Sequence, residues 1–205
     1  MTFIEYLMSQ FGIGEPIFIK QIQYESYSRP WIFKELKKLV NSGTLKRFAR
    51  GVYYFPEKMP FGEVPLNAWE MAVQHFITDG NEVYGYVAGF SLLNLSGLST
   101  QVPNFLEVAT NKESTRVRDI RIGYQRVRAH RSRTTVTKEN FKTLQLLELM
   151  SIMNPADLDE TEQFLLRKFV KASGATRGSI RRYVKFFPDR AAKNLILTGA
   201  IYRIQ

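Results

Sequence analysis

Apolar side chains recur every three or four positions near the start of the chain, a spacing that is typical of amphipathic helices. A first helix is expected over 3–11, where Thr2 is suited to cap the N-terminus and Glu5 stands at the capping-box position. A second, short helix is expected over 15–22, because Glu15-Pro16 suits a helix start and four isoleucine or phenylalanine side chains follow.

The most regular helical pattern covers residues 29–41. Ser28 precedes it as an N-cap candidate, and Pro30 falls in the first turn, where its missing N–H costs no hydrogen bond. After this helix the pattern changes to alternation, which predicts a β-hairpin with strands at 44–48 and 52–55.

Three helices followed by a hairpin describe a winged helix-turn-helix, which is expected at 1–58. Prolines at positions 56, 60 and 65 then mark a boundary, and 64–205 is expected to form a larger C-terminal domain. The expected fold class is therefore α+β: an N-terminal winged helix-turn-helix, then a mixed α/β domain with a helical C-terminal tail.

Within 64–205 the apolar spacing changes repeatedly between the helix and strand periods. Residues 119–129 alternate well enough to predict one strand, with Ile120, Ile122 and Tyr124 facing the core. Further strands are expected at 83–87 and 105–110, and helices at 66–78, 88–95, 141–153, 161–172, 176–185 and 189–197.

The charge of the chain is strongly basic and unevenly distributed. Lys and Arg number 29 against 19 Asp and Glu, a formal net charge of +10. The excess lies in three blocks, at 1–60, 112–133 and 174–205, whereas 61–111 carries five acidic and no basic residues. Such blocks indicate a polyanionic partner, and the alternative is that each block is a solvated face.

The composition excludes several classes of protein. The chain has no cysteine and only two histidines, His75 and His130, so disulfide scaffolds, cysteine-ligated zinc and histidine-rich metal sites are excluded. No apolar run is long enough to span a bilayer, and no basic segment precedes an apolar run at the start. We expect a cytoplasmic protein without a membrane partner, metal or cofactor.

The expected helix over 29–41 carries basic side chains opposite its apolar stripe. In a helix-turn-helix this helix enters the major groove, so Arg29 suits guanine, and Lys34 and Lys38 suit phosphates. Two alternatives stay open: Trp31 packs the helix onto the wing, and the whole unit binds a protein rather than DNA. The candidate DNA contacts are Ser28, Arg29, Trp31, Lys34, Lys37, Lys38, Lys46, Arg47 and Arg50.

Arginines in the second block come in pairs two positions apart. On a strand each pair shares one face and forms a ridge that suits nucleic acid, a nucleotide phosphate or an acidic protein. The alternative is a solvent-facing strand side. The third block follows helical spacing. The candidates for this basic surface are Arg116, Arg118, Arg126, Arg128, Arg131, Arg133, Arg177, Arg181, Arg182 and Lys185.

No catalytic constellation is recognised in the sequence. Asp119, the acid considered for Mg²⁺, has no second carboxylate two residues away, and neither a P-loop nor a G-x-S-x-G motif occurs. We therefore expect a protein that is not an enzyme. An enzyme that acts on nucleotides through Asp119 is retained as an alternative hypothesis.

Three segments of the chain match the pattern of one known family. They are L-x-x-L-x-x-x-G-x-L-x-R-x-x-R-G-V-Y at 36–53, GFSLLNLSGLSTQVP at 89–103 and VATN at 108–111. In these segments the chain resembles the AbiEi-type antitoxins of bacterial type IV toxin–antitoxin (abortive infection) systems. The resemblance covers about residues 1–130, and the helical tail more loosely.

The resemblance implies a protein with two tasks. The winged helix would bind inverted repeats in double-stranded promoter DNA and repress its own transcription. The C-terminal domain would counter a nucleotidyltransferase-type toxin without a stable complex. By position, the resemblance implies DNA contacts at Arg29, Lys34, Lys38, Arg47 and Arg50, and leaves the blocks at 116–133 and 177–185 to DNA or the toxin. The alternative function is a non-catalytic adaptor that binds an acidic partner through its arginines.

Overall fold

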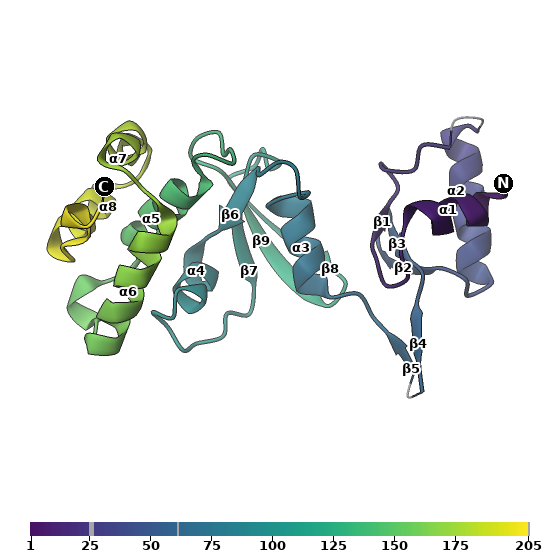
Figure 1. The fold of residues 1–205 in the computed structure, drawn as a ribbon, viewed down its shortest axis with the longest axis horizontal. Helices are drawn as coiled ribbons and strands as arrows, with labels where there is room; N and C mark the ends of the chain where they lie inside the picture. The colour runs from purple at the N-terminus through teal and green to yellow at the C-terminus, as the bar shows by residue number, and fades with distance from the viewer. Residues whose placement is uncertain (25–26, 61, 205) are drawn as a thin grey trace. The chain divides into compact units, whose positions relative to one another are not determined.

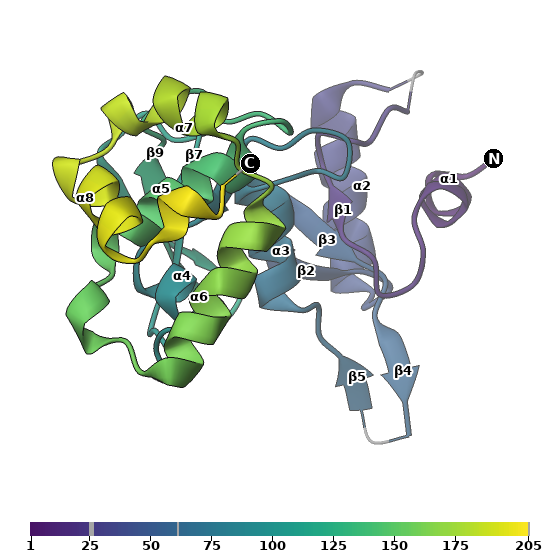
Figure 2. The same cartoon turned by 60° about the vertical axis from the view of Figure 1, so that its left-hand side comes forward.

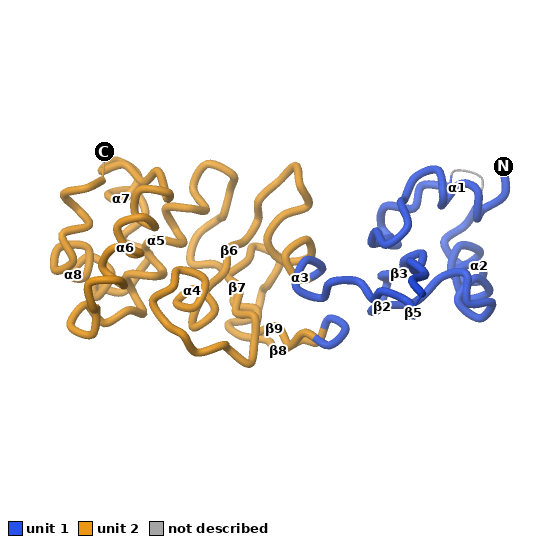
Figure 3. The backbone as a smooth tube through the Cα atoms, turned by 60° about the horizontal axis from the view of Figure 1, so that its bottom comes forward, with its two compact units in different colours: residues 1–71, 122–124 blue, residues 72–121, 125–205 orange. Residues whose placement is uncertain are grey.

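The computed structural model of the protein describes residues 1–24, 27–60 and 62–204. The chain divides into two units, residues 1–71 with 122–124 and residues 72–121 with 125–205 (Figure 3). The boundary predicted between 58 and 64 falls on a small hairpin of β4 (Glu57–Met59) and β5 (Gly62–Val64). No helix in the described ranges is long and apolar enough to cross a membrane.

The N-terminal unit has the order helix, strand, helix, hairpin (Figure 1). The two helices are α1 (Phe3–Gln10) and α2 (Arg29–Asn41), as the apolar spacing predicts. The predicted capping box is also present, since the Glu5 N–H donates to Thr2 Oγ1 and the Thr2 N–H donates to Glu5 Oε2. The predicted hairpin consists of β2 (Lys46–Ala49) and β3 (Val52–Tyr54).

The short helix predicted over 15–22 is wrong. This segment contains the strand β1 (Ile17–Phe18), which pairs antiparallel with β3 and gives a three-stranded sheet in the order β1-β3-β2. The β-branched Ile17 and Ile19 favour extended backbone, and the Ile19 N–H donates to the Gly51 carbonyl. Pairing with the hairpin thus outweighs the local helical signal. The predicted winged helix-turn-helix class of this unit stays a prediction.

The C-terminal unit contains a mixed four-stranded sheet in the order β6-β7-β9-β8. Strand β7 pairs antiparallel with β6 on one side and parallel with β9 on the other. The strands are β6 (Gly85–Val87), β7 (Leu106–Thr110), β8 (Val117–Ile122) and β9 (Gln125–Arg131).

The single strand predicted over 119–129 is also wrong, because the chain reverses within it. Gly123 adopts a φ of +56°, a left-handed conformation that a two-residue turn between β8 and β9 requires. Tyr124, predicted to face the core, stands on this turn and is 67% exposed. Ile122, on one side of the turn, is buried as predicted, and Val127 on the other side is buried as well.

The helix α5 (Phe141–Ile152) lies at the centre of the C-terminal unit. It contacts the sheet through β6 and also contacts four helices, as Figures 1 and 2 show. Six of its twelve residues are buried, five are half-buried, and only Lys142 of this helix is exposed. The surrounding helices are α4 (Gly89–Leu95), α6 (Glu160–Ser173), α7 (Arg177–Tyr183) and α8 (Asp189–Leu197), and α3 (Ala68–Phe76) precedes the sheet.

Asn194 of α8 closes the C-terminal end of α5. Its side chain is 2% exposed, and its Nδ2 donates to the carbonyls of Met150 at 2.8 Å and Met153 at 3.0 Å. The last carbonyls of a helix lack partners within the helix, so a buried helix end needs donors of this kind. Asn194 therefore ties the C-terminal helix to the central one.

Replacing Asn194 by alanine should destabilise the protein by about 2 kcal/mol, because two buried carbonyls lose a donor. Urea unfolding followed by circular dichroism measures this loss. Lys193→Ala, at the exposed neighbouring position, is the matched control and should change the stability by less than about 0.5 kcal/mol. Equal stabilities of the two variants would show that Asn194 does not hold α5.

Candidate functional site

The exposed face of α2 presents two lysines and an aromatic ring. Ile32 and Leu36 bury the opposite face in the core of the N-terminal unit. Helical spacing then directs Phe33, Lys34 and Lys37 to solvent, and Phe33 is 52% exposed. Phe33 is not among the contacts predicted from the sequence, although its position one residue after Ile32 places it outside the buried stripe.

Several of the predicted DNA contacts are already engaged within the chain. Lys38 Nζ lies 2.5 Å from Glu35 Oε1, and Lys46 Nζ lies 3.1 Å from Glu63 Oε2. The guanidinium groups of Arg29 and Arg47 donate to the carbonyls of Ile19 at 2.6 Å and Ala49 at 3.4 Å.

Three other candidates keep their charge open to solvent. Lys34, Lys37 and Arg50 are exposed, and none of them forms an ion pair with another described residue. Arg50 stands at the turn of the β2–β3 hairpin. Ser28 is the N-cap residue of α2, but its hydroxyl makes no capping hydrogen bond. The N–H groups of the first turn of α2 therefore have no acceptor from this side chain.

Trp31 packs inside the unit, as the packing alternative for this residue expects. Its ring stacks on Tyr27 at a centroid distance of 3.9 Å and meets Phe3 edge-on at 5.4 Å. The partners come from α1 and the segment before α2, whereas the sequence suggested the wing. Aromatic stacking on this flank fixes which side of α2 faces outward.

The arginines of the β8–β9 hairpin do not form one continuous ridge. Arg126 and Arg128 share a face of β9, since both guanidinium groups lie over the Phe105 ring, at 4.1 Å and 4.3 Å from its centroid. Arg118 instead pairs with the buried Glu113, its Nε lying 2.7 Å from Glu113 Oε2. Arg116 and Arg118, predicted to share one face, therefore differ: Arg118 is held in an ion pair, whereas Arg116 lines a cavity described below.

The carboxylate of Asp119 is engaged by an arginine. Arg128 Nε and Nη2 donate to its two oxygens at 2.8 Å and 2.9 Å, a bidentate geometry. The hydrogen bonds from Arg128 hold the pKa of Asp119 below its usual value. This is the acid that the alternative enzyme hypothesis assigned to a metal ion, and it is bound instead to a guanidinium group.

Other arginines meet at a cavity of about 520 Å³ inside the C-terminal unit. We call it the arginine cavity. Its walls come from the sheet, α4 and α5, and Arg131 and Arg133 reach it from the end of β9 and the residues beyond. It is lined by Tyr86, Ala88, Gly89, Phe90, Leu93, Glu107, Ala109, Arg116, Val117, His130, Arg131, Arg133, Glu148 and Ile152.

Two acid–base pairs lie within this lining. Arg133 Nε is 3.5 Å from Glu148 Oε2, and His130 Nε2 is 3.4 Å from Glu107 Oε2. Burial raises the pKa of Glu148 above its usual value, and the charge of Arg133 only partly opposes this rise. The cavity therefore holds a carboxyl group whose pKa is raised by burial, with a guanidinium group beside it.

Tyr86 lines the same cavity, and its side chain is 1% exposed. Of the buried side-chain nitrogens and oxygens in the described part of the chain, its hydroxyl alone has no hydrogen-bond partner. Burial raises the pKa of this phenol, the negative charge of Glu148 raises it further, and the positive charge of Arg133 lowers it. Tyr86 is therefore electrostatically coupled to both partners of the Arg133–Glu148 pair.

A glycine makes room for Glu107 at the start of α4. A Cβ at Gly89 would come within 2.3 Å of Glu107 Oε2, and the φ of Gly89 is +54°, which disfavours other residues. The N–H of Phe90 donates to Glu107 Oε1 at 3.3 Å. The motif GFSLLNL thus lets a carboxylate, already near His130, approach the backbone of α4.

Two further features lie near the C-terminus. Arg177, Arg181, Arg182 and Lys185 are all exposed, on α7 and the 3₁₀ turn Val184–Phe186, so the third basic block faces solvent.

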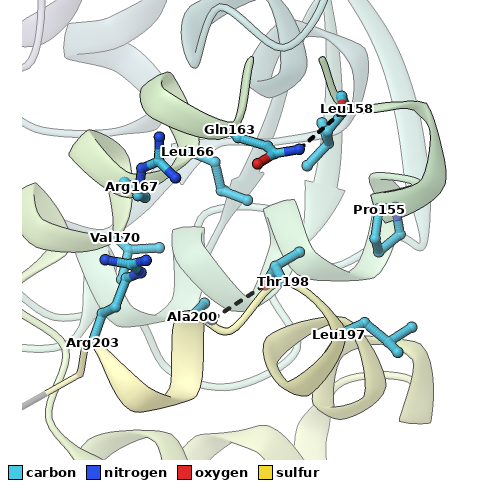
Figure 4. Close-up of a pocket in the computed structure, with 10 residues that line it drawn as sticks. All are labelled: Pro155, Leu158, Gln163, Leu166, Arg167, Val170, Leu197, Thr198, Ala200 and Arg203. Atoms are coloured by element: carbon cyan, nitrogen blue, oxygen red, sulfur yellow. Dashed lines mark hydrogen bonds between the residues drawn. The ribbon is translucent and has the colours of Figure 1, made fainter. Parts of the chain in front are cut away.

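A second cavity of the C-terminal unit lies between α6 and α8 and has a volume of about 160 Å³ (Figure 4). Its lining residues include Leu166, Arg167, Leu197 and Arg203. It is smaller than most ligand pockets.

The arrangement defines a mixed α/β protein with a basic helical face in one unit and a charged cavity in the other. The chain matches the model of a family of unknown function (DUF6088) over residues 4–175, and it belongs to that family. The matched span includes α2 and the whole arginine cavity and ends before α7. No curated protein and no solved structure matches the chain.

Replacing Glu148 by glutamine should reduce the dependence of stability on pH. The folded state raises the pKa of Glu148, so it binds more protons than the unfolded state, and the wild type loses stability as pH rises through that interval. The variant lacks this titration and should lose less stability between about pH 4 and about pH 7. Urea unfolding over a pH series measures the difference.

Glu160→Gln, at an exposed position in the first turn of α6, is the control. Its pH profile should parallel that of the wild type. A Glu148→Gln profile that also parallels the wild type would contradict the assignment of a protonation-favouring environment to the cavity.

Proposed function

We propose that this protein binds double-stranded DNA through α2 and the β2–β3 hairpin of its N-terminal unit. The observation that carries the proposal is the face of α2 on which Phe33, Lys34 and Lys37 are exposed together. The unit keeps two parts of the expected winged helix-turn-helix, a basic helix and a following hairpin, although strand β1 stands where the second helix was predicted. In that class of fold such a helix enters the major groove and the hairpin contacts the backbone.

The roles of the side chains follow from their surroundings. Lys34 and Lys37 lie three positions apart and carry charge that no described acid neutralises, which suits contacts with phosphates. Phe33 lies beside them and suits apolar contact with a thymine methyl group. Arg50, at the tip of the hairpin, suits the backbone or the minor groove. Lys38 and Lys46 contribute less, because each already has an acidic partner.

The start of α2 adds a second mode of binding. Arg29 uses one guanidinium nitrogen on the Ile19 carbonyl and keeps further donors for a base edge. The free N–H groups of the first turn, together with the Ser28 hydroxyl, suit a phosphate oxygen. Base reading is thus assigned to Arg29 and Phe33, and positioning to the lysines.

The finer part of the proposal is a promoter-binding autorepressor that acts as a type IV antitoxin. It is supported by the resemblance of 36–53, 89–103 and 108–111 to the AbiEi-type antitoxins. Expression of the chain should relieve growth arrest caused by a nucleotidyltransferase encoded beside its gene. Lack of relief, with the antitoxin expressed and folded, would remove this part and leave DNA binding intact.

DNA binding is tested by mobility-shift titration of the full chain on its upstream promoter region, over a salt series. Replacing both Lys34 and Lys37 by alanine should lower the slope of log K against log salt by about 2, because each phosphate contact contributes about 0.9. Affinity at moderate salt should fall by about tenfold or more.

The matched control replaces Lys168 and Lys171, two lysines with the same spacing on the exposed face of α6, by alanine. Its net charge equals that of the test variant, so a general electrostatic effect would weaken both equally. Equal weakening, or no preference of the wild type for the promoter over random duplex, would exclude the assigned interface.

A further inference from the structure

The arginine cavity is large enough to hold a small organic molecule. Its volume of about 520 Å³ falls within the usual range for ligand pockets, about 300–1,000 Å³. All of its lining residues belong to the C-terminal unit. Eight of its fourteen lining residues are apolar, aromatic or glycine, and the other six carry acidic or basic side chains.

The charge of the lining favours an anion. Two carboxylates, Glu107 and Glu148, each face a basic group, His130 and Arg133 respectively. Arg116 and Arg131 have no ion-pair partner among the described residues, and both are exposed at the cavity. A guanidinium group without a carboxylate partner keeps its donors for a phosphate, which accepts bidentate hydrogen bonds from arginine.

The buried hydroxyl of Tyr86 gives an independent indication of a ligand. A buried polar atom without a partner is uncommon in native proteins, and each case calls for a physical reason. Replacement by phenylalanine would remove the unpaired group without loss of packing, so the hydroxyl contributes nothing to the fold that the structure accounts for. A bound molecule that supplies the missing hydrogen bond is such a reason.

The remaining walls suit a ring. Phe90 and Leu93 project from α4, and Val117 and Ile152 complete the apolar part of the lining. Phe90 is 67% exposed, so its ring is available for stacking. The cavity thus offers an apolar surface for a flat group beside guanidinium groups for a phosphate.

We propose that the arginine cavity binds a small organic phosphate of the size of a nucleoside monophosphate. Arg116 and Arg131 bind the phosphate, the Tyr86 hydroxyl takes a polar group of the ligand, and Phe90 with Leu93 contacts the ring. The proposed DNA contacts all belong to the N-terminal unit, so this inference does not depend on the DNA-binding proposal.

Isothermal titration of the full chain with defined probes tests the proposal. The probes are AMP, GMP, CMP and UMP, with adenosine and inorganic phosphate as fragments of the first. At least one nucleotide is expected to bind about tenfold or more tightly than either fragment, because only the whole molecule uses both parts of the cavity. No binding of any nucleotide, or equal binding of inorganic phosphate, would overturn the proposal.

Arginine variants locate the site. Arg116→Gln and Arg131→Gln should each weaken nucleotide binding by about tenfold or more, since a charge-assisted hydrogen bond is lost. Arg121→Gln and Arg126→Gln change the same hairpin outside the cavity and should bind as the wild type does. All four positions are exposed, so the variants are expected to fold. Equal affinity of all four would place binding elsewhere and overturn the assignment.

Tyr86→Phe separates a ligand-binding role from a structural one. This variant should weaken nucleotide binding by about fivefold or more, the loss of a hydrogen bond, and should leave the Tm of the unliganded protein unchanged or raised. A structural hydroxyl would give the opposite pattern, a lowered Tm with unchanged affinity. That result would remove Tyr86 from the site.

Discussion

Enclosure of α5, on which only Lys142 is exposed, is the constraint on which the C-terminal unit depends. A helix without a solvent face must be covered by a sheet on one side and by helices on the others, and β6, α4, α6, α7 and α8 supply that cover. Its polar groups then need partners inside the molecule. Asn194 satisfies the carbonyls at its end, and Arg133 faces the carboxyl of Glu148, the acid of this helix. The arginine cavity exists where this acid meets the sheet.

In the N-terminal unit, packing rather than charge decides the orientation of the proposed DNA-binding surface. The aromatic rings around Trp31 hold one flank of α2, and Ile32 and Leu36 hold the next. What remains for solvent is the stripe of Phe33, Lys34 and Lys37. The basic face of α2 and the arginine cavity belong to different units, so no residue contributes to both.

The long amphipathic helices were predictable from the sequence because many apolar positions repeat one period. Short segments were not: residues 15–22 fit a helix by count, but strand pairing with the hairpin decides their structure. The reversal at Gly123 was hidden because alternation continues on both sides of the turn. The cavity was not predictable, because Tyr86, Glu107, Arg131 and Glu148 meet only through the sheet and α5. The one indication in the sequence was Glu148, because an acidic residue within an otherwise apolar helix suggests a polar site inside the protein.

The position of β8 at the edge of its sheet gives part of the arginine block a further consequence. An edge strand presents unpaired N–H and carbonyl groups, onto which a strand of another molecule can add. Arg118, Asp119 and Arg121, half of the residues of β8, stand exposed along it, so a second chain that approached this edge would meet charged side chains. Charged side chains on an edge strand disfavour pairing with a strand of another molecule. Arg118, one of the arginines from which anion binding was expected, thus also serves to keep this edge unpaired.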